Sequence, residues 1–112
     1  MIDECLFCKI LAGEVPSEIV YEDEHILAFN DLYPKAPFHL LIIPKKHIAT
    51  LNDLEDADTE LAGRLFAVAR KIADEKGFAD DGYRMMMNCG EGGGQIIFHM
   101  HLHLMAGKKF TA

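Results

Sequence analysis

The chain has 112 residues, half of them apolar and about a quarter charged, which is the size and composition of one soluble globular domain. Its net charge of −7 argues against general binding to nucleic acid or to an anionic membrane, because both are negatively charged. The first residues, MIDECLFCKI, do not resemble a signal peptide, and no apolar run approaches the roughly 20 residues that cross a bilayer. We therefore expect a cytoplasmic protein whose three cysteines are reduced.

The first predicted elements are a short helix and three strands. Residues 6–13, LFCKILAG, favour a helix that Gly13 ends. Two apolar runs, 19–21 and 25–30, flank an acidic turn and predict a hairpin. A third strand is predicted at 37–47, where PFHLLIIPKKH is largely apolar and its two prolines, which cannot donate ladder hydrogen bonds, limit the strand.

One long helix and two more strands are predicted in the rest of the chain. Residues 52–77 carry apolar side chains at helical spacing, and Gly77 is placed to end the helix. Strands at 82–88 and 96–106 follow, joined by a glycine-rich loop. Few of these connections suit parallel crossovers, so the sequence predicts an α+β fold with a mainly antiparallel five-stranded sheet in a single domain, 1–112.

A small sheet with an exposed edge strand also favours pairing with a second copy. We expect a two-fold homodimer that uses the long helix and the strand at 82–88. A partner subunit or a metal ion would add stability to the modest core of so short a chain.

Three of the six histidines lie at alternate positions in the last predicted strand. Side chains alternate between the two faces of a strand, so these histidines share one face. The apolar residues between them share the other face, where they can pack on the long helix. The histidines are His99, His101 and His103, and the apolar residues are Met100, Leu102 and Leu104.

One metal ion cannot bind all three of these histidines. In a strand, His99 and His103 are roughly 13 Å apart at Cα. An imidazole nitrogen lies only about 4.5 Å from its own Cα and binds zinc at about 2.0–2.1 Å, so both could reach one ion only along a straight line. That arrangement excludes a tetrahedral site, and the three histidines must be divided between roles.

A pair of cysteines near the start of the chain has the spacing of metal ligands. Cys5 and Cys8 form C-x2-C, which suits zinc better than a redox pair because no βαβ unit surrounds it. Two more ligands are needed, and His47 and one of the three C-terminal histidines are candidates. His47 could equally be a solvated residue after two lysines.

The glycine-rich loop and the central histidine together indicate phosphate chemistry. The loop CGEGGGQ (89–95) can turn backbone N–H groups toward an anion, although it matches no P-loop or dinucleotide motif and could be a plain hairpin loop. A neutral imidazole with a pKa of about 6.5 is a good nucleophile at pH 7. Attack by His101 on phosphorus gives a phospho-imidazole that water can hydrolyse, and this chemistry needs no metal ion.

These motifs resemble the histidine triad family. HMHLHLM matches its signature His-φ-His-φ-His-φ-φ, where φ is hydrophobic. The segments CLFCKILAGEVPSEIVYEDEHILAFNDLYPKAPFHLLIIPKKH and GYRMMMNCGEGGGQ resemble other parts of its members. The resemblance is strongest to the nucleotide-binding branch, the purine nucleoside phosphoramidate hydrolases. It implies a homodimer with one ten-stranded sheet, and release of AMP or GMP and an amine through a covalent nucleotidyl-histidine.

The resemblance also implies a role for each matching residue. His101 would be the nucleophile, His103 would contact the phosphate or the leaving group, and His39 would support the catalytic histidine. Asp31 would bind the ribose hydroxyls, and Asn88 would bind phosphate or fix the nucleophile. The phosphate would be lined by Gly94, Gln95 and Ile96, and the purine by Leu32, Phe29 and Phe7.

Members of the family that carry the N-terminal C-x2-C use it to bind structural zinc. The four ligands implied here are Cys5, Cys8, His47 and His99. Ile96 stands where many members carry a polar residue, and Cys89 has no assigned role. Two other functions stay open, namely hydrolysis of dinucleoside polyphosphates and nucleotide binding by a zinc-stabilised module with negligible turnover.

Overall fold

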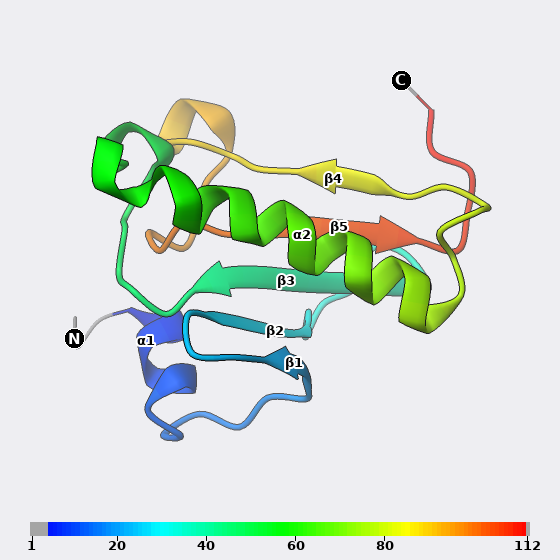
Figure 1. Ribbon diagram of the computed structural model, residues 1–112, viewed down its shortest axis with the longest axis horizontal. Helices are drawn as coiled ribbons and strands as arrows, with labels where there is room; N and C mark the ends of the chain where they lie inside the picture. Colours follow the sequence, from blue (N-terminus) through cyan, green and yellow to red (C-terminus); the bar gives the residue numbers. More distant parts are fainter. Residues whose placement is uncertain (1–4, 112) are drawn as a thin grey trace.

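The computed structural model describes residues 5–111, in which five strands form one antiparallel sheet (Figure 1). The strand order is β1-β2-β3-β5-β4, so β1 and β4 are the two edges. The strands are β1 (Ile19–Glu22), β2 (Ile26–Asn30), β3 (Phe38–Pro44), β4 (Arg84–Met86) and β5 (Leu102–Ala106). With the helices α1 (Leu6–Leu11) and α2 (Thr59–Lys76), they confirm the predicted α+β fold and the order of its elements.

The two helices cover opposite faces of the sheet. Ile26 and Ala28 of β2 lie in the core beneath α2, whereas Leu27 and Phe29 of the same strand lie in a smaller core with α1. The same alternation runs along β3. Because both faces are covered, the two central strands β2 and β3 are apolar almost throughout.

The long helix begins at Thr59, later than the sequence predicted, and ends at Gly77 as expected. Before it lie two short 3-10 turns, η1 (Leu51–Asp53) and η2 (Asp56–Asp58). In each turn an aspartate carboxylate accepts a backbone N–H from three residues earlier, at 3.0 and 3.1 Å. Short acidic side chains compete for backbone donors in this way, which favours turns over a continuous helix.

The last strand is also shorter than predicted, because β5 begins only at Leu102. Its ladder with β3 stops at the pair Ile42 and Leu102, and β3 ends at Pro44, which has no N–H to continue it. The N–H of Met100 donates instead to the carbonyl of Ile48, at 2.6 Å. The first two histidines of the triad therefore lie in an irregular segment that leads into β5.

The predicted division of apolar and histidine side chains is nevertheless correct. Met100, Leu102 and Leu104 are buried in the core beneath α2. The edge strand β4 also covers fewer residues than the predicted 82–88, but it pairs with β5 so that Met86 lies opposite His103.

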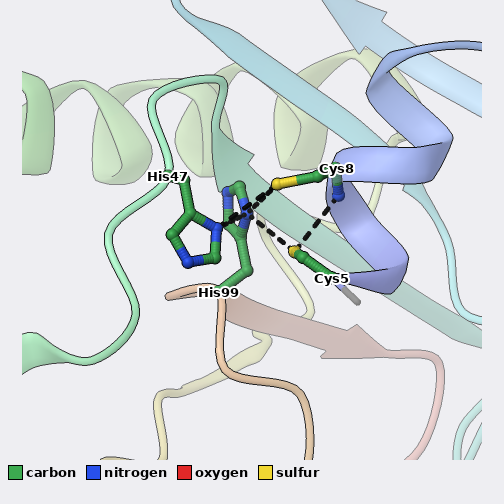
Figure 2. A group of neighbouring side chains, drawn as sticks. All are labelled: Cys5, Cys8, His47 and His99. Atoms are coloured by element: carbon green, nitrogen blue, oxygen red, sulfur yellow. Dashed lines mark hydrogen bonds between the residues drawn. The ribbon is translucent and has the colours of Figure 1, made fainter. Parts of the chain in front are cut away.

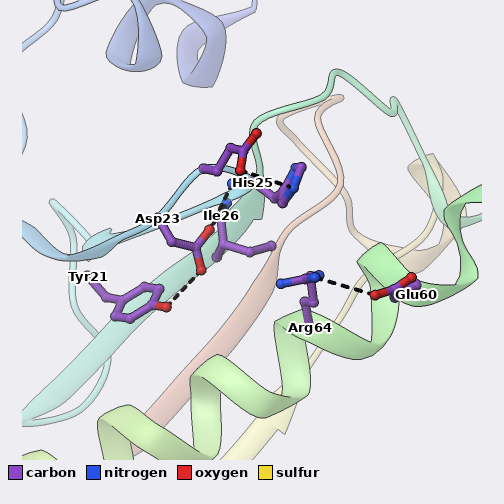
Figure 3. Close-up of polar contacts among 7 residues, drawn as sticks. Tyr21, Asp23, His25, Ile26, Glu60 and Arg64 are labelled. Atoms are coloured by element: carbon purple, nitrogen blue, oxygen red, sulfur yellow. Dashed lines mark hydrogen bonds and ion pairs between the residues drawn. The ribbon is translucent and has the colours of Figure 1, made fainter.

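The surface between α2 and the β1–β2 hairpin carries paired charges (Figure 3). Asp23 holds the hairpin turn, since one carboxylate oxygen accepts the N–H groups of His25 and Ile26, each at 2.8 Å. On α2, Arg64 pairs with Glu60 at 3.3 Å. Two hollows of about 410 and 550 Å³ lie here, and none of the predicted site residues lines them.

A helix that crosses a bilayer must be about 20 residues long and largely apolar. Within residues 5–111, neither α1 nor α2 is both long and apolar enough to cross a membrane.

Candidate active site and metal centre

Four predicted metal ligands from three parts of the chain converge at one point (Figure 2). Cys5 and Cys8 lie at the start of α1, His47 follows β3, and His99 precedes β5. The Nδ1 atoms of the two histidines are 3.2 Å apart, and three sulfur–Nδ1 distances are 3.3, 3.4 and 3.6 Å. Together, these four residues form what we call the Cys2His2 cluster.

The hydrogen bonds around this cluster leave a nitrogen lone pair facing the sulfurs. The Nε2–H of His99 donates to the carbonyl of Pro44 at 2.7 Å, so the lone pair lies on Nδ1. Burial is the main reason that the pKa of His99 falls to about 4, and the ring is therefore neutral at pH 7. A neutral imidazole whose other nitrogen donates to a carbonyl is the form in which histidine binds metals.

A second set of histidines forms a chain of hydrogen bonds between the start of β3 and β5. The backbone N–H of Lys35 donates to Nδ1 of His39 at 3.0 Å, so the proton of His39 lies on Nε2. That Nε2–H donates to Nδ1 of His103 at 2.9 Å. In a neutral ring the proton of His103 must then lie on Nε2, which leaves an N–H available to a ligand.

His101 has the opposite tautomer. Its Nδ1–H donates to the carbonyl of His99 at 2.8 Å, so the lone pair lies on Nε2. The rings of His101 and His103 are neighbours, with centroids 5.0 Å apart. The geometry thus places a ring that can attack beside a ring that can donate a hydrogen bond.

Burial keeps both rings neutral. Loss of hydration lowers the pKa of His101 below its usual value of about 6.5. The same cause, together with the nearby His101 and His39, lowers the pKa of His103 to about 4. At pH 7 the lone pair of His101 is therefore available without prior removal of a proton.

We expect the folded protein to lose stability as the pH falls from about 6.5 to about 4, partly through His103. In this window the unfolded chain binds a proton at this residue that the folded chain does not, at a cost of up to about 1.4 kcal/mol per pH unit. The groups that face the ring are His39, His101, Asp31 and Lys35. The free energy of unfolding, measured with urea at several pH values across this range, should change less per pH unit in His103→Asn than in the wild type. Equal changes with pH in the two proteins would contradict the assignment.

A further group of possible metal ligands overlaps this hydrogen-bond chain. Asp31, His39 and His103 place one ligand atom each within 4.8 Å of the others, and Asp31 Oδ2 is 3.4 Å from Nε2 of His39. However, His39 Nδ1 already accepts the N–H of Lys35, so Nε2 carries the proton and has no lone pair for a metal. We interpret these three residues as a hydrogen-bonded set.

The glycine-rich loop is braced by Gln95, a feature that the sequence did not predict. Its side-chain oxygen accepts the N–H of Gly90 at 2.8 Å, and its amide nitrogen donates to the carbonyls of Ala49 and Ile97 at 2.8 and 3.0 Å. The family resemblance implies that Gln95 lines a phosphate site, but its side chain is buried inside the loop. The only feature of the sequence that could have indicated this bracing role is the position of Gln95, an amide residue directly after the glycines.

The other predicted nucleotide-binding residues lie in different environments. Asn88 is near the loop, since a Cβ added at Gly94 would lie 3.9 Å from its Nδ2 atom. Leu32 and Ile96 are exposed, at 62% and 85%. The remaining two, Phe7 and Phe29, are buried and stack edge to face at 5.4 Å.

Comparison with known proteins gives consistent matches over nearly the whole chain. A family model described as scavenger mRNA decapping enzyme C-term binding matches residues 4–111. The purine nucleoside phosphoramidase of Escherichia coli (strain K12) is 46% identical over 108 residues, which cover 96% of this chain and 91% of that protein.

Solved structures of similar proteins have the same fold. A HIT family hydrolase from Legionella pneumophila Philadelphia 1 is 53% identical, with a TM-score of 0.94 over 96% of each chain. A histidine triad protein from Clostridium difficile is 48% identical, with a TM-score of 0.97 over 100% of this chain and 97% of that chain.

Proposed function

Because the chain belongs to the histidine triad family, we propose that it is a hydrolase that cleaves the phosphorus–nitrogen bond of purine nucleoside 5′-phosphoramidates. The observation that carries the proposal is the pair of neutral rings, with a lone pair on His101 and an N–H on His103. The substrate class is supported by the similarity to a protein named purine nucleoside phosphoramidase.

The proposed reaction has two steps. In the first, Nε2 of His101 attacks the α-phosphorus, the phosphorus–nitrogen bond breaks, and the amine leaves after taking up one proton. The N–H of His103 stabilises the charge on the phosphoryl oxygens or the leaving nitrogen. In the second step, water attacks the phosphorus, the bond to Nε2 of His101 breaks and AMP or GMP is released, and one proton of that water goes to the solvent, which balances the proton that the amine took up from the solvent in the first step.

The remaining site residues are proposed to bind the substrate. Asp31 would accept hydrogen bonds from the ribose hydroxyls, and Asn88 would hold the phosphate together with backbone N–H groups of residues 94–96. Leu32 and Phe29 would contact the purine, with Phe7 behind them. His39 would act through His103, because it orients that ring by the hydrogen bond described above.

We further propose that the Cys2His2 cluster binds zinc as a structural ion. Bonds of about 2.3 Å to sulfur and 2.0–2.1 Å to nitrogen separate the ligands of a tetrahedral zinc by roughly 3.3–3.8 Å. The measured separations of 3.2 to 3.6 Å are close to this range. Four protein ligands leave no open position for water, so the ion would stabilise the fold and the histidines would supply the chemistry.

A panel of substrates tests the proposed activity. Purified protein is offered adenosine and guanosine 5′-phosphoramidates of simple amines and of lysine, together with diadenosine polyphosphates, at both catalytic and stoichiometric enzyme concentrations. We expect multiple turnovers on the phosphoramidates and much slower cleavage of the polyphosphates. Faster cleavage of the polyphosphates would favour the second activity, and a single turnover or none would favour a binding module. Because Cys5, Cys8 and Cys89 form no disulfide with one another, we place this activity in the reducing cytoplasm.

The homodimer is also a proposal, in which two copies of the single domain 1–112 pair along β4 and α2. Phe66 on α2 and Met85 and Met86 on the edge strand β4 are 52%, 41% and 39% exposed, so this pairing would bury large apolar side chains. Sedimentation velocity at micromolar concentration should give a dimer for the wild type and a monomer for Phe66→Glu. Ile19→Glu, on the opposite edge strand β1, should stay dimeric. A monomeric wild type would exclude this assembly.

A further inference from the structure

The imidazole of His101 lies beside His103 on one side, and two further contacts come from residues tied to the Cys2His2 cluster. One is the hydrogen bond from Nδ1–H to the carbonyl of His99, which is itself a cluster residue. The other is the ring of Phe7, whose centroid lies 5.1 Å from that of His101 with an angle of 88° between the planes. The hydrogen bond sets the tautomer, and the edge-to-face contact restricts rotation of the ring.

Phe7 lies between the two cysteines of the cluster in the sequence. Its side chain is only 3% exposed and also contacts the ring of His99, with centroids 6.0 Å apart. Cys5 forms the N-cap of α1, since its sulfur accepts the N–H of Cys8 at 3.2 Å. Phe7 is therefore part of a single turn of backbone with a cluster sulfur at each end.

This turn is held both by the apolar packing of α1 against β2 and β3 and by the contacts of the cluster. The helix α1 has six residues, and isolated helices shorter than about 12–15 residues are marginal in water. Two cluster contacts, from Cys8 to His47 and from Cys5 to His99, join α1 to the segments after β3 and before β5. The two sulfurs and two Nδ1 atoms of the cluster are mostly hydrogen-bond acceptors that face one another. A bound cation therefore holds them together more strongly than their own hydrogen bonds can.

We propose that Phe7 is a positioning residue that couples metal occupancy of the Cys2His2 cluster to the orientation of His101. The inference rests on the proposed function, because it concerns the nucleophile of that reaction. When the cluster holds its ion, Phe7 and the carbonyl of His99 keep the lone pair of Nε2 directed toward the phosphate. When the ion is lost, α1 withdraws, and the imidazole gains rotational freedom that lowers the rate of attack.

This role differs from that of a wall of the purine pocket, which the family resemblance implies for Phe7. A wall contributes to substrate binding, so its removal raises KM and leaves kcat unchanged. A positioning residue acts on the reacting atom, so its removal lowers kcat with little effect on KM. Its removal also changes the ring signals of His101 in the absence of any substrate.

The experiment compares Phe7→Leu with Phe78→Leu in the full chain loaded with zinc. Phe78 is a matched control, since it is also buried, at 4% exposed, and it stacks on Phe38 and Tyr83. Each protein is labelled with ¹⁵N-histidine, and long-range ¹H–¹⁵N spectra record the tautomer of His101. Zinc content, kcat and KM are measured on the same samples. If Phe7→Leu does not fold, Phe7→Met gives the same comparison.

We expect one Nδ1–H tautomer of His101 in the wild type and in Phe78→Leu, and a mixture of tautomers in Phe7→Leu with zinc content unchanged. The kcat of Phe7→Leu should fall on the order of 10- to 100-fold, with KM changed much less. Removing zinc from the wild type by chelation at low temperature should change the His101 signals in the same way. In Phe7→Leu, chelation should add little further change.

Two results would overturn the proposal. One is a Phe7→Leu protein with the wild-type tautomer, unchanged kcat and raised KM. The other is a metal-free wild type in which the His101 signals stay as they were. If the wild type hydrolyses no substrate of the panel, the proposed function fails, but the spectra still decide whether Phe7 couples the cluster to His101.

Discussion

Replacing His101 by alanine is expected to abolish phosphoramidate hydrolysis while zinc content, fold and AMP binding remain close to those of the wild type. The substitution removes the only ring of the triad with a free lone pair on Nε2, because the proton of His103 lies on Nε2 and His99 belongs to the metal cluster. Loss of a nucleophile typically costs on the order of 10⁴-fold or more in kcat. Steady-state rates, zinc analysis and calorimetric titration with AMP measure the three quantities on one preparation.

The variant His101→Asn serves as the structural control for this prediction. Its amide can still donate a hydrogen bond to the carbonyl of His99, so the segment before β5 should stay in place while the nucleophile is lost. Both variants should be inactive to a similar degree. A His101→Ala protein that loses its metal yet keeps hydrolysing phosphoramidates would overturn the assignment.

Replacing Cys5 by serine is expected to lower zinc occupancy and to destabilise the protein. A ligand that binds only the folded state stabilises it by about 4 kcal/mol when its free concentration is about 1,000 times Kd, and this contribution disappears with the site. Serine is itself a favoured N-cap residue and its hydroxyl can still accept the N–H of Cys8, so the loss of stability reports the metal site rather than the helix cap. Zinc per chain and thermal unfolding, with and without a chelator, measure both effects.

Cys89→Ser is the matched control, because Cys89 is a half-buried free cysteine outside the metal cluster. It should keep one zinc per chain and nearly the unfolding temperature of the wild type. A wild-type protein that contains no zinc after expression in metal-rich medium would contradict the structural role. So would a chelator that leaves the unfolding temperature unchanged.

The fold was predictable where one local pattern acted alone. The apolar runs of β2 and β3 and the helical spacing of apolar residues in α2 identified these elements, since these apolar side chains must be buried. The boundaries failed where a competing interaction was present. Asp53 and Asp58 bind backbone N–H groups and delay the start of α2, and Pro44 ends the ladder that the strand of the histidines was expected to continue.

The candidate site, too, was only partly predictable from the sequence. The spacing of the histidines excludes a single metal site for all three, and C-x2-C is a spacing typical of zinc ligands but is a weak signal alone, so the full set of four ligands came from the family resemblance. The tautomers could not be predicted, because they depend on which hydrogen-bond partner each ring meets in the folded chain. The proton of His39 is placed by the N–H of Lys35, and that of His103 by His39, across 64 residues of chain.

By itself, then, the sequence determined the order of the elements, the side of the last strand that packs on the long helix and the residue types available for chemistry, because these follow from local periodicity and composition. Only the tertiary structure decided which nitrogen of each histidine carries a proton, that Gln95 braces the glycine loop, and that Phe7 lies against His101. Phe7 meets His101, and Gln95 meets Ala49, across long stretches of chain, and even the short-range bond from His101 to His99 depends on how the folded backbone turns the ring. Such contacts exist only once the helices have covered both faces of the sheet, and no local pattern encodes them.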